Sequence, residues 1–383
     1  MSDRYDVGVV GAGIVGLAHA YELARRGLKA IVFERHPRAQ GASVRNFGMI
    51  WPIGQSNGIR FETALRSRDI WVDVVRRSGI WYRECGSLHL AYREDEAQVV
   101  REFVAAAKPD RPCEVLSPAA VLDRCPIVEP DGLLAGMWSP TELAVDPREV
   151  IAKLPDWLSR EYGVTFAYGN PVLGYDLPRV TTPDGDFHVD RLAICAGADF
   201  RELAPKAFAA SGLFPVKLQM MRSRPLELAI GGRETGCPHL AAGLTLGHYT
   251  SFTDCPTLPA LKRRLDSELP EYRRYGIHVM ATQNGLGELV LGDSHEYGDD
   301  IGIFDNPCID ELVLKYLRGF LSVPGLEIAS RWQGVYIKHP SKPWVVADLG
   351  GNAIAVTGVG GAGMTLSFGL AERAVGDWLG DAV

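Results

Sequence analysis

The sequence predicts an α/β domain built on a doubly wound, largely parallel sheet, joined to an α+β domain with a large, mostly antiparallel sheet. Three observations support this fold class. A strand, a glycine-rich turn, a helix and a second strand fill residues 4–34. Alternating, strand-like segments dominate residues 214–293. An apolar strand, a glycine-rich turn and a helix end the chain, so its two ends predict one domain and its middle predicts another.

The α/β domain is therefore expected to be discontinuous in sequence. We assign residues 1–85, 145–213 and 335–383 to it, and residues 86–144 and 214–334 to the α+β domain, which would bind the substrate. A chain of 383 residues is long enough for two domains that each bury a core.

The N-terminal unit has the order of a Rossmann-like fold. An apolar strand at residues 7–10 precedes a helix from about residue 14 to residue 26. A second apolar strand at residues 30–33 ends on Glu34. The Glu34 carboxylate is thereby placed to accept hydrogen bonds from both hydroxyls of a ribose, which disfavours NADP but does not separate FAD from NAD.

Three glycines between the first strand and the helix have G-x-G-x-x-G spacing. Gly11 permits the tight turn, Gly13 lets the backbone approach a pyrophosphate, and Gly16 lets the helix pack closely on the sheet. The N-terminus of the helix, at Ile14 and Val15, directs N–H groups toward the phosphates. The alternative is a glycine-rich turn that binds nothing.

The remaining elements follow from periodicity and from turn residues. Helices are predicted at residues 60–79, 94–107, 117–123, 147–162, 305–321 and 365–379. Strands are predicted at residues 81–92, 132–138, 164–168, 172–175, 179–182, 192–195, 214–228, 245–252, 276–281, 289–293, 331–338, 344–348 and 354–359. The Asp184–Gly185 and Asn284–Gly285 pairs predict tight turns.

Composition limits the classes of partner. The net charge of −7 disfavours nucleic acid as a partner, and no apolar run reaches the roughly 18 residues of a membrane span. The first strand begins almost at the N-terminus, which leaves no room for a signal peptide. The seven cysteines form no C-x-x-C pair, so we expect reduced thiols, no metal site and a cytoplasmic protein.

The loop after Glu34 is the next candidate for a binding function. Gly41 and Gly48 flank Ser43, Arg45 and Asn46, and such a loop commonly lies against a flat or charged group. The alternative is an Ω-loop that packs on itself. Met49 and Trp51 follow the loop and either line the site or belong to the core.

Four segments together resemble the D-amino-acid oxidase superfamily, near glycine oxidase and sarcosine oxidase. They are the fingerprint that ends at Glu34–Arg35, the G-A-S-x-x-N-x-G stretch at residues 41–48, the C-A-G-A stretch at residues 195–198, and the glycine-rich turn at residues 358–369. The resemblance covers nearly the whole chain and implies bound FAD. It also implies hydride transfer from a small amine to the flavin, with no protein base strictly required.

The resemblance and the fingerprint together assign residues to the cofactor. These are Gly11, Gly13, Ile14, Val15, Gly16, Glu34, Arg35, Ser43, Arg45, Asn46, Gly48, Val172, Ala196, Gly197, Gly361, Gly363, Met364 and Thr365. The N-terminus of the last helix would face the flavin and stabilise its reduced, anionic form.

The sequence departs from the family at three positions. Tyr336 stands where relatives that act on α-amino acids carry an arginine, and Thr365 stands where sarcosine oxidases carry a lysine. Gly334 stands where sarcosine oxidases carry the cysteine that tethers FAD, so noncovalent FAD is expected. Residues 45–55 also resemble a bacterial subgroup proposed to oxidise aminophosphonates, which implies a substrate such as 2-aminoethylphosphonate or an N-methylated or hydroxylated relative.

The substrate site is less well defined than the cofactor site. Its candidates are Arg45, Met49, Trp51, His248, Tyr249, Tyr336, Lys338 and His339. His248 and Tyr249 are placed on the strand at residues 245–252, as a pocket floor or as core. Lys338 and His339 either bind an anionic group or only end a strand.

Several alternatives stay open at this stage. The enzyme could be a glycine, sarcosine or D-amino-acid oxidase or dehydrogenase, or a 2-hydroxy-acid dehydrogenase. From a different class, it could be a flavoprotein subunit that serves in assembly. The sequence leaves open whether the electron acceptor is oxygen, a quinone or a protein, and it leaves the oligomeric state open.

Overall fold

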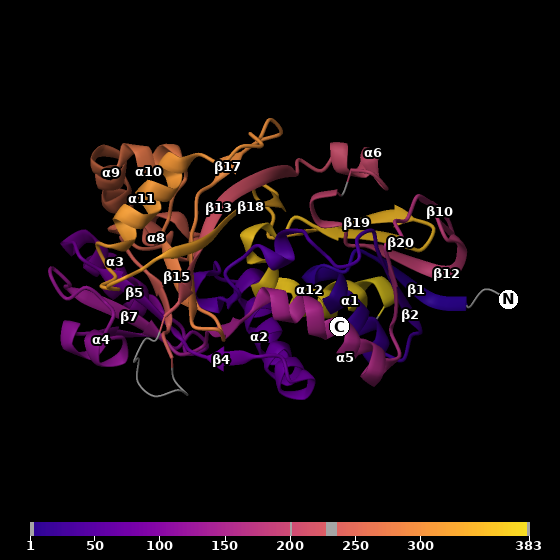
Figure 1. Ribbon diagram of the computed structural model, residues 1–383, viewed down its shortest axis with the longest axis horizontal. Coiled ribbons are helices and arrows are strands. Elements are labelled where there is room, and N and C mark those ends of the chain that lie inside the picture. Colours follow the sequence, from indigo (N-terminus) through magenta and orange to yellow (C-terminus); the bar gives the residue numbers. More distant parts are fainter. Residues whose placement is uncertain (1–3, 200, 227–235, 381–383) are drawn as a thin grey trace.

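The parallel sheet forms the half of the molecule that contains β1 and β2 (Figure 1). The computed structural model describes residues 4–199, 201–226 and 236–380. The strands run in the order β10-β11-β12-β1-β2-β9, and β20 and β19 extend the sheet alongside the end of β12. Their bounds are β1 Arg4–Val10, β2 Ala30–Glu34, β9 Thr165–Tyr168, β10 Gly174–Asp176, β11 Arg179–Thr182, β12 Gly185–Ile194, β19 Val345–Gly350 and β20 Ala353–Thr357.

The central strands of this sheet are parallel, as predicted for a doubly wound fold. β1 pairs with β2 and β12, β2 pairs with β9, and β12 pairs with β20, all in parallel. Every residue of β2 is buried, because helices cover the sheet and the strand needs apolar side chains on both faces. The antiparallel strands β10, β11 and β19 lie at the margin of the sheet.

Four long helices pack beside the parallel sheet. They are α1 Ile14–Arg25, α2 Ile59–Ser78, α5 Pro147–Tyr162 and α12 Gly363–Leu379. Tyr21 of α1 stacks on Trp157 of α5 at 5.9 Å between ring centroids and meets Phe368 of α12 edge-on at 5.6 Å. These aromatic contacts pack α1 against α5 and α12.

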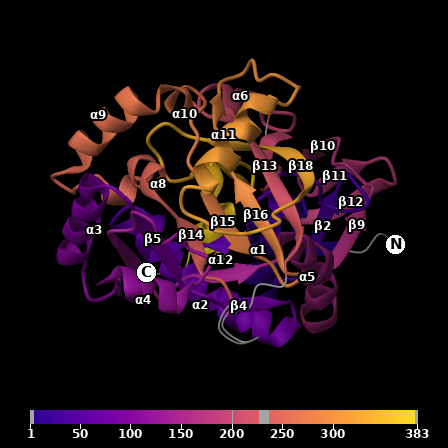
Figure 2. The ribbon, with the colours of Figure 1, turned by 60° about the vertical axis from the view of Figure 1, so that its left-hand side comes forward.

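The antiparallel sheet occupies the other half of the molecule (Figure 2). Its order is β17-β13-β16-β15-β14-β5-β7-β6, and β18 pairs with β13. Only the pairing of β14 with β5 is parallel among the described strands of this sheet. The bounds are β5 Ser87–Ala91, β6 Glu114–Leu116, β7 Ala135–Ser139, β13 Phe214–Pro225, β14 His239–Ala241, β15 Met280–Gln283, β16 Glu288–Gly292, β17 Glu296–Tyr297 and β18 Ile328–Lys338.

Most of the remaining helices pack on this second sheet. They are α3 Glu94–Ala106, α4 Pro118–Arg124, α8 Gly243–His248, α9 Leu258–Glu268, α10 Pro270–Arg274 and α11 Pro307–Leu317. The short helix α6 Pro205–Ala209 packs instead on the parallel sheet, where Phe208 joins the core formed by β1, β2 and β12. A small sheet of β3 Met49–Ile50, β8 Leu143–Val145 and β4 Tyr82–Glu84 lies beside α2 and α12. Arg264 of α9 forms an ion pair with Asp95 of α3 at 2.7 Å, which ties two helices that are far apart in sequence.

The strand predicted at residues 245–252 is wrong. Residues 243–248 form α8 and residues 250–252 form a 3₁₀ turn, with the Tyr249 N–H donating to the Thr245 carbonyl at 3.2 Å. Leu244, Leu246 and Phe252 are all buried in one apolar core. A short segment buried on all sides has no polar face, so its pattern cannot separate helix from strand.

Other boundaries also differ from the prediction. The strand predicted at residues 81–92 is broken into β4 and β5 at Gly86, which has a φ of +61°. The strand predicted at residues 276–281 begins only at Met280, and the helices α9 and α10 were not predicted. The end of the strand predicted at residues 214–228 lies outside the described residues.

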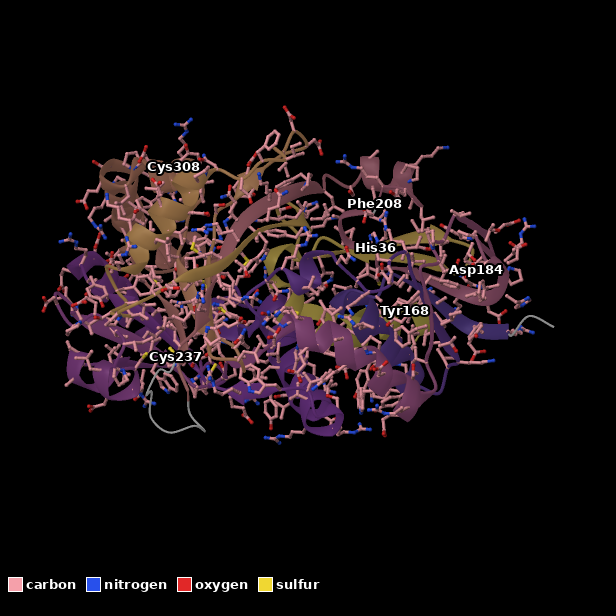
Figure 3. All side chains as sticks on the ribbon, in the orientation of Figure 1. His36, Tyr168, Asp184, Phe208, Cys237 and Cys308 are labelled. Atoms are coloured by element: carbon pink, nitrogen blue, oxygen red, sulfur yellow. The ribbon has the colours of Figure 1, made fainter. Side chains whose placement is uncertain are left out.

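Two features of the structure bear on the expectations from composition, namely the state of the cysteines and the length of the apolar helices. All seven cysteines are free thiols, and Cys237 and Cys308 lie well apart in Figure 3, at the end of the molecule distant from Asp184. No helix in the described ranges is long and apolar enough to cross a membrane. The division into two discontinuous domains stays a proposal, and β18 runs through its boundary at residues 334 and 335.

Candidate active site

A cavity of about 870 Å³ lies between the two sheets. Its walls come from the carboxyl ends of β1, β2, β12 and β20 on one side, and from β13, β15 and β18 on the other. The carboxyl edge of a doubly wound sheet is where such folds bind ligands, and the volume falls within the usual range for a ligand site. Every site residue predicted from the sequence lines this cavity, except Gly16 and Gly48.

Gly16 and Gly48 contribute through backbone packing instead. A Cβ on Gly16 would overlap the carbonyl oxygen of Gly11, so the glycine lets α1 lie against the turn. A Cβ on Gly48, which has a φ of +77°, would overlap the carbonyl oxygen of Val145 in β8. Gly48 therefore holds the loop against the small sheet and does not contact a ligand.

The glycine-rich turn opens the cavity at the N-terminus of α1. Gly11 has a φ of +101°, and its Cβ would lie 2.7 Å from the Cys195 carbonyl oxygen. A Cβ on Gly13 would lie 3.0 Å from Ser43 Oγ, at the wall of the cavity. The absence of side chains at Gly11 and Gly13 lets a ligand approach the backbone of the turn and the N-terminus of α1, which suits a phosphate.

Glu34 lies at the end of β2 with its carboxylate held in place. Its Oε2 accepts a hydrogen bond from the Ala12 N–H at 3.0 Å, and its Oε1 accepts one from the His36 N–H at 3.0 Å. Each oxygen keeps a lone pair, so the carboxylate can still accept hydrogen bonds from two hydroxyls. Figure 3 shows His36 in the half of the molecule that contains the parallel sheet.

The loop at residues 41–48 closes over this end of the cavity. Ser43 Oγ accepts a hydrogen bond from the Ile14 N–H at 2.9 Å. Asn46 donates from Nδ2 to the carbonyls of Ala42 and Ser43 and accepts from the Gly48 N–H, so its amide serves to shape the loop. The loop therefore packs on itself and also lines the cavity, and its contact with the cofactor stays a prediction.

Two arginines near this loop have different surroundings. Arg35 forms ion pairs with Asp199 and, at 3.7 Å, with Glu202. Arg45 donates from Nη1 to the Gln333 carbonyl at 3.2 Å, which ties the loop to β18. The charge of Arg35 is thus compensated by two acids, whereas the Arg45 guanidinium donates to a neutral carbonyl group.

A second helix N-terminus also reaches the cavity, at α12. Its first residue is Gly363, and Ala362 before it supplies no capping side chain. The Thr365 hydroxyl accepts from the Trp51 N–H at 2.9 Å and lies 3.4 Å from the Met49 carbonyl. Because backbone groups of β3 and the next residue occupy this hydroxyl, it is not available to a substrate.

The other half of the cavity holds the predicted substrate candidates. Tyr336 and Lys338 come from β18, and Met49 and Trp51 come from the segment after the loop. His339 is half-buried, and its Nδ1 accepts from the backbone N–H groups of Ser341 and Lys342, which shapes the turn after β18. His248 and Tyr249 line the cavity as predicted, although they lie at the end of α8 and not on a strand.

Several cavity residues were missed by reasoning from sequence. Arg60 is the second residue of α2, His278 precedes β15, and Asp293 and His295 follow β16. None lies in a motif, so no local signal pointed to them. The histidine and aspartate are adjacent because the antiparallel pairing continues beyond the strands, with the backbone N–H of each donating to the carbonyl of the other.

The substrate half carries two cations without an acidic partner. Arg60 donates from Nε to Gln55 Oε1 at 2.7 Å, and Lys338 lies over the ring of Tyr297. Across the described part of the chain, neither forms an ion pair with a carboxylate. Burial lowers the pKa of both groups, and the positive charge of Arg60 lowers the pKa of Lys338 further.

Comparison with known families identifies this arrangement. A family model described as "FAD dependent oxidoreductase" matches residues 6–376. The chain belongs to this family of FAD dependent oxidoreductases. The resemblance to the D-amino-acid oxidase superfamily is confirmed, and so are the expected cofactor, FAD, and the oxidoreductase class. The resemblance of residues 45–55 to an aminophosphonate-oxidising subgroup stays a prediction.

Relatives of this FAD dependent oxidoreductase are distant in sequence. A glycine oxidase from Geobacillus kaustophilus is 26% identical over 62% of this chain and 67% of its own length. A mitochondrial dimethylglycine dehydrogenase from Rattus norvegicus is 26% identical over 57% of this chain, but the match spans only 26% of its length. The structure of a glycine oxidase from Bacillus cereus superposes with a TM-score of 0.79 at 18% identity and covers 99% of this chain and 96% of its own, which shows the shared fold.

The cavity fits FAD on its own evidence. Gly11 and Gly13 leave the backbone uncovered where a pyrophosphate would lie, and Glu34 keeps free lone pairs for a ribose. The N-termini of α1 and α12 both begin at the cavity wall without a capping side chain from the preceding residue. Positive ends of helices at both sites suit the phosphates and a reduced flavin.

Proposed function

We propose that this FAD dependent oxidoreductase oxidises a small amine that carries an anionic group, and that the anion is a phosphonate. The observation that carries the proposal is the pair of uncompensated cations, Arg60 and Lys338, in the substrate half of the cavity. A buried charge is costly unless it is paired, so an anionic ligand is the natural partner of this site.

The amine part of the proposal rests on the relatives. Glycine oxidase and dimethylglycine dehydrogenase are named for amino acids, and the chain aligns with both. Those names describe the activities of the other proteins. Because only part of each relative aligns with this chain, we state the activity of this chain as a proposal.

The phosphonate part rests on the number and spread of donors. Arg60 comes from α2 and Lys338 comes from β18, so the two cations approach the cavity from different elements. The hydroxyls of Tyr249 and Tyr336 are near the same charges, since the positive charge of Arg60 acts on both phenols. Separated donors suit a tetrahedral group with three acceptor oxygens better than they suit a planar carboxylate.

The donor set differs from the one expected from sequence alone. Arg45 and His339 were candidates for the anion, but Arg45 holds Gln333 and His339 shapes a turn. Thr365 is occupied by backbone groups. We therefore assign the anion to Arg60, Lys338 and Tyr336, and we assign Met49, Trp51, His248 and Tyr249 to the remaining wall.

FAD, when bound, accepts the two electrons and the hydrogen that leave the substrate carbon. The chain's own contribution is to hold the anion between Arg60 and Lys338, so that the amine end has one orientation. Tyr336 is buried and closes the wall beside the glycine-rich turn, which excludes water from the reacting carbon.

We assign the cofactor half to the remaining cavity residues. The adenosine and pyrophosphate end is proposed to contact Gly11, Gly13, Ile14, Val15, Glu34, Arg35, Ser43, Val172, Ala196 and Gly197. The flavin end is proposed to contact Arg45, Asn46, Gly361, Gly363, Met364 and the backbone of Thr365.

Anaerobic reduction of the bound flavin tests the proposal. The flavin absorbance near its long-wavelength band is followed after addition of 2-aminoethylphosphonate, its N-methyl and hydroxyl derivatives, glycine, sarcosine, D-alanine, a 2-hydroxy acid and an uncharged amine. We expect an aminophosphonate to reduce the flavin fastest. A higher kcat/KM for glycine, sarcosine or D-alanine than for every aminophosphonate would overturn the proposal that the anion is a phosphonate. Reduction by the hydroxy acid alone would overturn the proposal that the substrate is an amine.

A further inference from the structure

Three histidines from separate segments meet at the wall of the substrate half. The ring centroids of His248 and His278 are 3.8 Å apart, those of His248 and His295 are 4.7 Å apart, and those of His278 and His295 are 5.1 Å apart. All three rings line the cavity. We call His248, His278 and His295 the imidazole cluster.

A buried carboxylate lies behind the imidazole cluster. Asp293 Oδ1 is 3.1 Å from His278 Nε2, and both residues are buried. His295 directs Nδ1 to the Gly276 carbonyl at 3.0 Å, which leaves Nε2 to face the other rings or the cavity. Asp293 is the acid that lines the substrate half, because Glu34, Asp199 and Glu202 lie at the cofactor end.

The surroundings keep the imidazole cluster uncharged before a ligand binds. Burial lowers the pKa of His295 to about 4 and holds the pKa values of His248 and His278 well below the ordinary value. Lys338 and Arg273 face His248 and add repulsion, while burial raises the pKa of Asp293. The other titratable groups that face this region are Arg60, Tyr249, Tyr297 and Tyr336.

An amine substrate creates a requirement that such a cluster can meet. In neutral water an alkylamine carries a proton, and its nitrogen lone pair must be free before the adjacent carbon can lose a hydride. A base within reach of the ammonium group removes this barrier, and histidine is the residue most often used for that purpose.

We propose that the imidazole cluster, backed by Asp293, is the base that takes the proton from the substrate's ammonium group. The N–H bond of the ammonium breaks, its electron pair stays on the substrate nitrogen, and a new N–H bond forms at an imidazole nitrogen of the cluster. Charge is conserved in this step, and no further reactant is needed. The inference rests on the proposed function, because it requires an amine in this cavity.

The anionic end of the substrate makes the transfer more favourable. The positive charge of Lys338 lowers the pKa values of His248 and His295, so it disfavours an imidazolium while it is uncompensated. A phosphonate bound between Arg60 and Lys338 offsets their charge and places negative charge near the rings, which stabilises the protonated cluster. The base therefore becomes stronger only when the correct substrate is bound.

Metal binding is the competing role for three imidazoles, whose nearest nitrogens lie within 4.8 Å of one another. The observed arrangement favours the base. The planes of His278 and His295 are 22° apart, so these rings stack face to face, whereas metal ligands point their lone pairs at one centre. Lys338 and Arg60 would also repel a divalent cation.

The pH dependence of flavin reduction tests the inference. Reduction by 2-aminoethylphosphonate is measured from pH 6 to pH 10 for the wild type, His278→Asn, His248→Asn and Asp293→Asn, with His188→Asn on β12 as a control outside the cavity. We expect losses on the order of 100-fold at pH 7 in the variants of His278, His248 and Asp293, recovery at high pH where the amine deprotonates in solution, and partial rescue by added imidazole. If the acidic limb of the pH profile lay at the same pH in these variants as in the wild type, the imidazole cluster would not be the base.

Two further measurements separate the possible failures. Ethylphosphonate has no amine to oxidise, so its binding reports only on the protein, and calorimetry in two buffers should show more proton uptake by the wild type than by His278→Asn. Equal proton uptake by the wild type and by His278→Asn would show that the bound anion does not favour protonation of the imidazole cluster. Stoichiometric metal in the holoenzyme, with activity lost to a chelator, would overturn the base in favour of a metal site. Failure of every anionic amine to reduce the wild-type flavin at any pH would instead overturn the proposed function.

Discussion

Arg60→Met removes the cation that we assign to the substrate's anion. In the structure this guanidinium has one side-chain hydrogen bond, from Nε to Gln55 Oε1 at 2.7 Å, and no ion pair within the described residues. The substitution keeps the unbranched stem that packs at the start of α2. We therefore expect the substitution to weaken substrate binding while it changes the free energy of unfolding little.

The size of each effect follows from the interactions that Arg60→Met removes from the free protein and from the substrate complex. The free protein loses one hydrogen bond, about 0.5–1.5 kcal/mol, and is relieved of an uncompensated charge, so the net change in the free energy of unfolding should be small. The complex loses a buried pair between a cation and an anion, which typically costs about 2–5 kcal/mol. That range corresponds to a fall in kcat/KM of about 30-fold to about 4,000-fold.

Steady-state kinetics and thermal unfolding together check this expectation. Arg76→Met is the matched control, because Arg76 lies on the same helix, is exposed and pairs with Glu84 at 2.9 Å on the surface. An amine without an anionic group serves as the control substrate, and its kcat/KM should change little with Arg60→Met. If kcat/KM for every anionic amine stayed within threefold of the wild type, Arg60 would not bind the anion and the reasoning would be refuted.

Three more predictions concern the cofactor and stability. Purified protein should be yellow and release FAD on acid denaturation, and flavin that stays with the precipitate would show a covalent link. Gly13→Val should abolish FAD retention, and Glu34→Ala should weaken it by about 1.5–3 kcal/mol, both measured by flavin content after dialysis. His89 is buried with both ring nitrogens lacking a described partner and has its pKa lowered to about 3 by burial, so it stabilises the fold above pH 6.5 and less as the pH falls toward 3. His89→Leu should therefore reduce the fall in Tm between pH 7 and pH 5, and an unchanged fall would contradict this.

Local sequence was sufficient to specify the cofactor half. The β1–α1–β2 unit was predicted within one residue at every end except the start of β1, which begins three residues before the predicted strand, because its strands and helix are set by periodicity and its turn is set by glycines. Gly11 and Gly16 are required by contacts within the same unit. Glu34 is held by the N–H groups of Ala12 and His36, which are near it in the chain or in the paired strand. Short-range constraints of this kind are readable from sequence.

Only the tertiary structure shows which residues line the half of the cavity that we assign to the substrate. Arg60, His278, Asp293 and His295 come from three segments and meet only because β15 and β16 pair and α2 begins beside them. No periodicity marks such residues, since their burial results from contacts across the cavity. The same reason explains α8, where an apolar segment enclosed on all sides gave no polar face from which to recognise a helix. The sequence therefore determined the parallel sheet, its glycine-rich turn and the enzyme class, while long-range packing decided which charged side chains line the cavity.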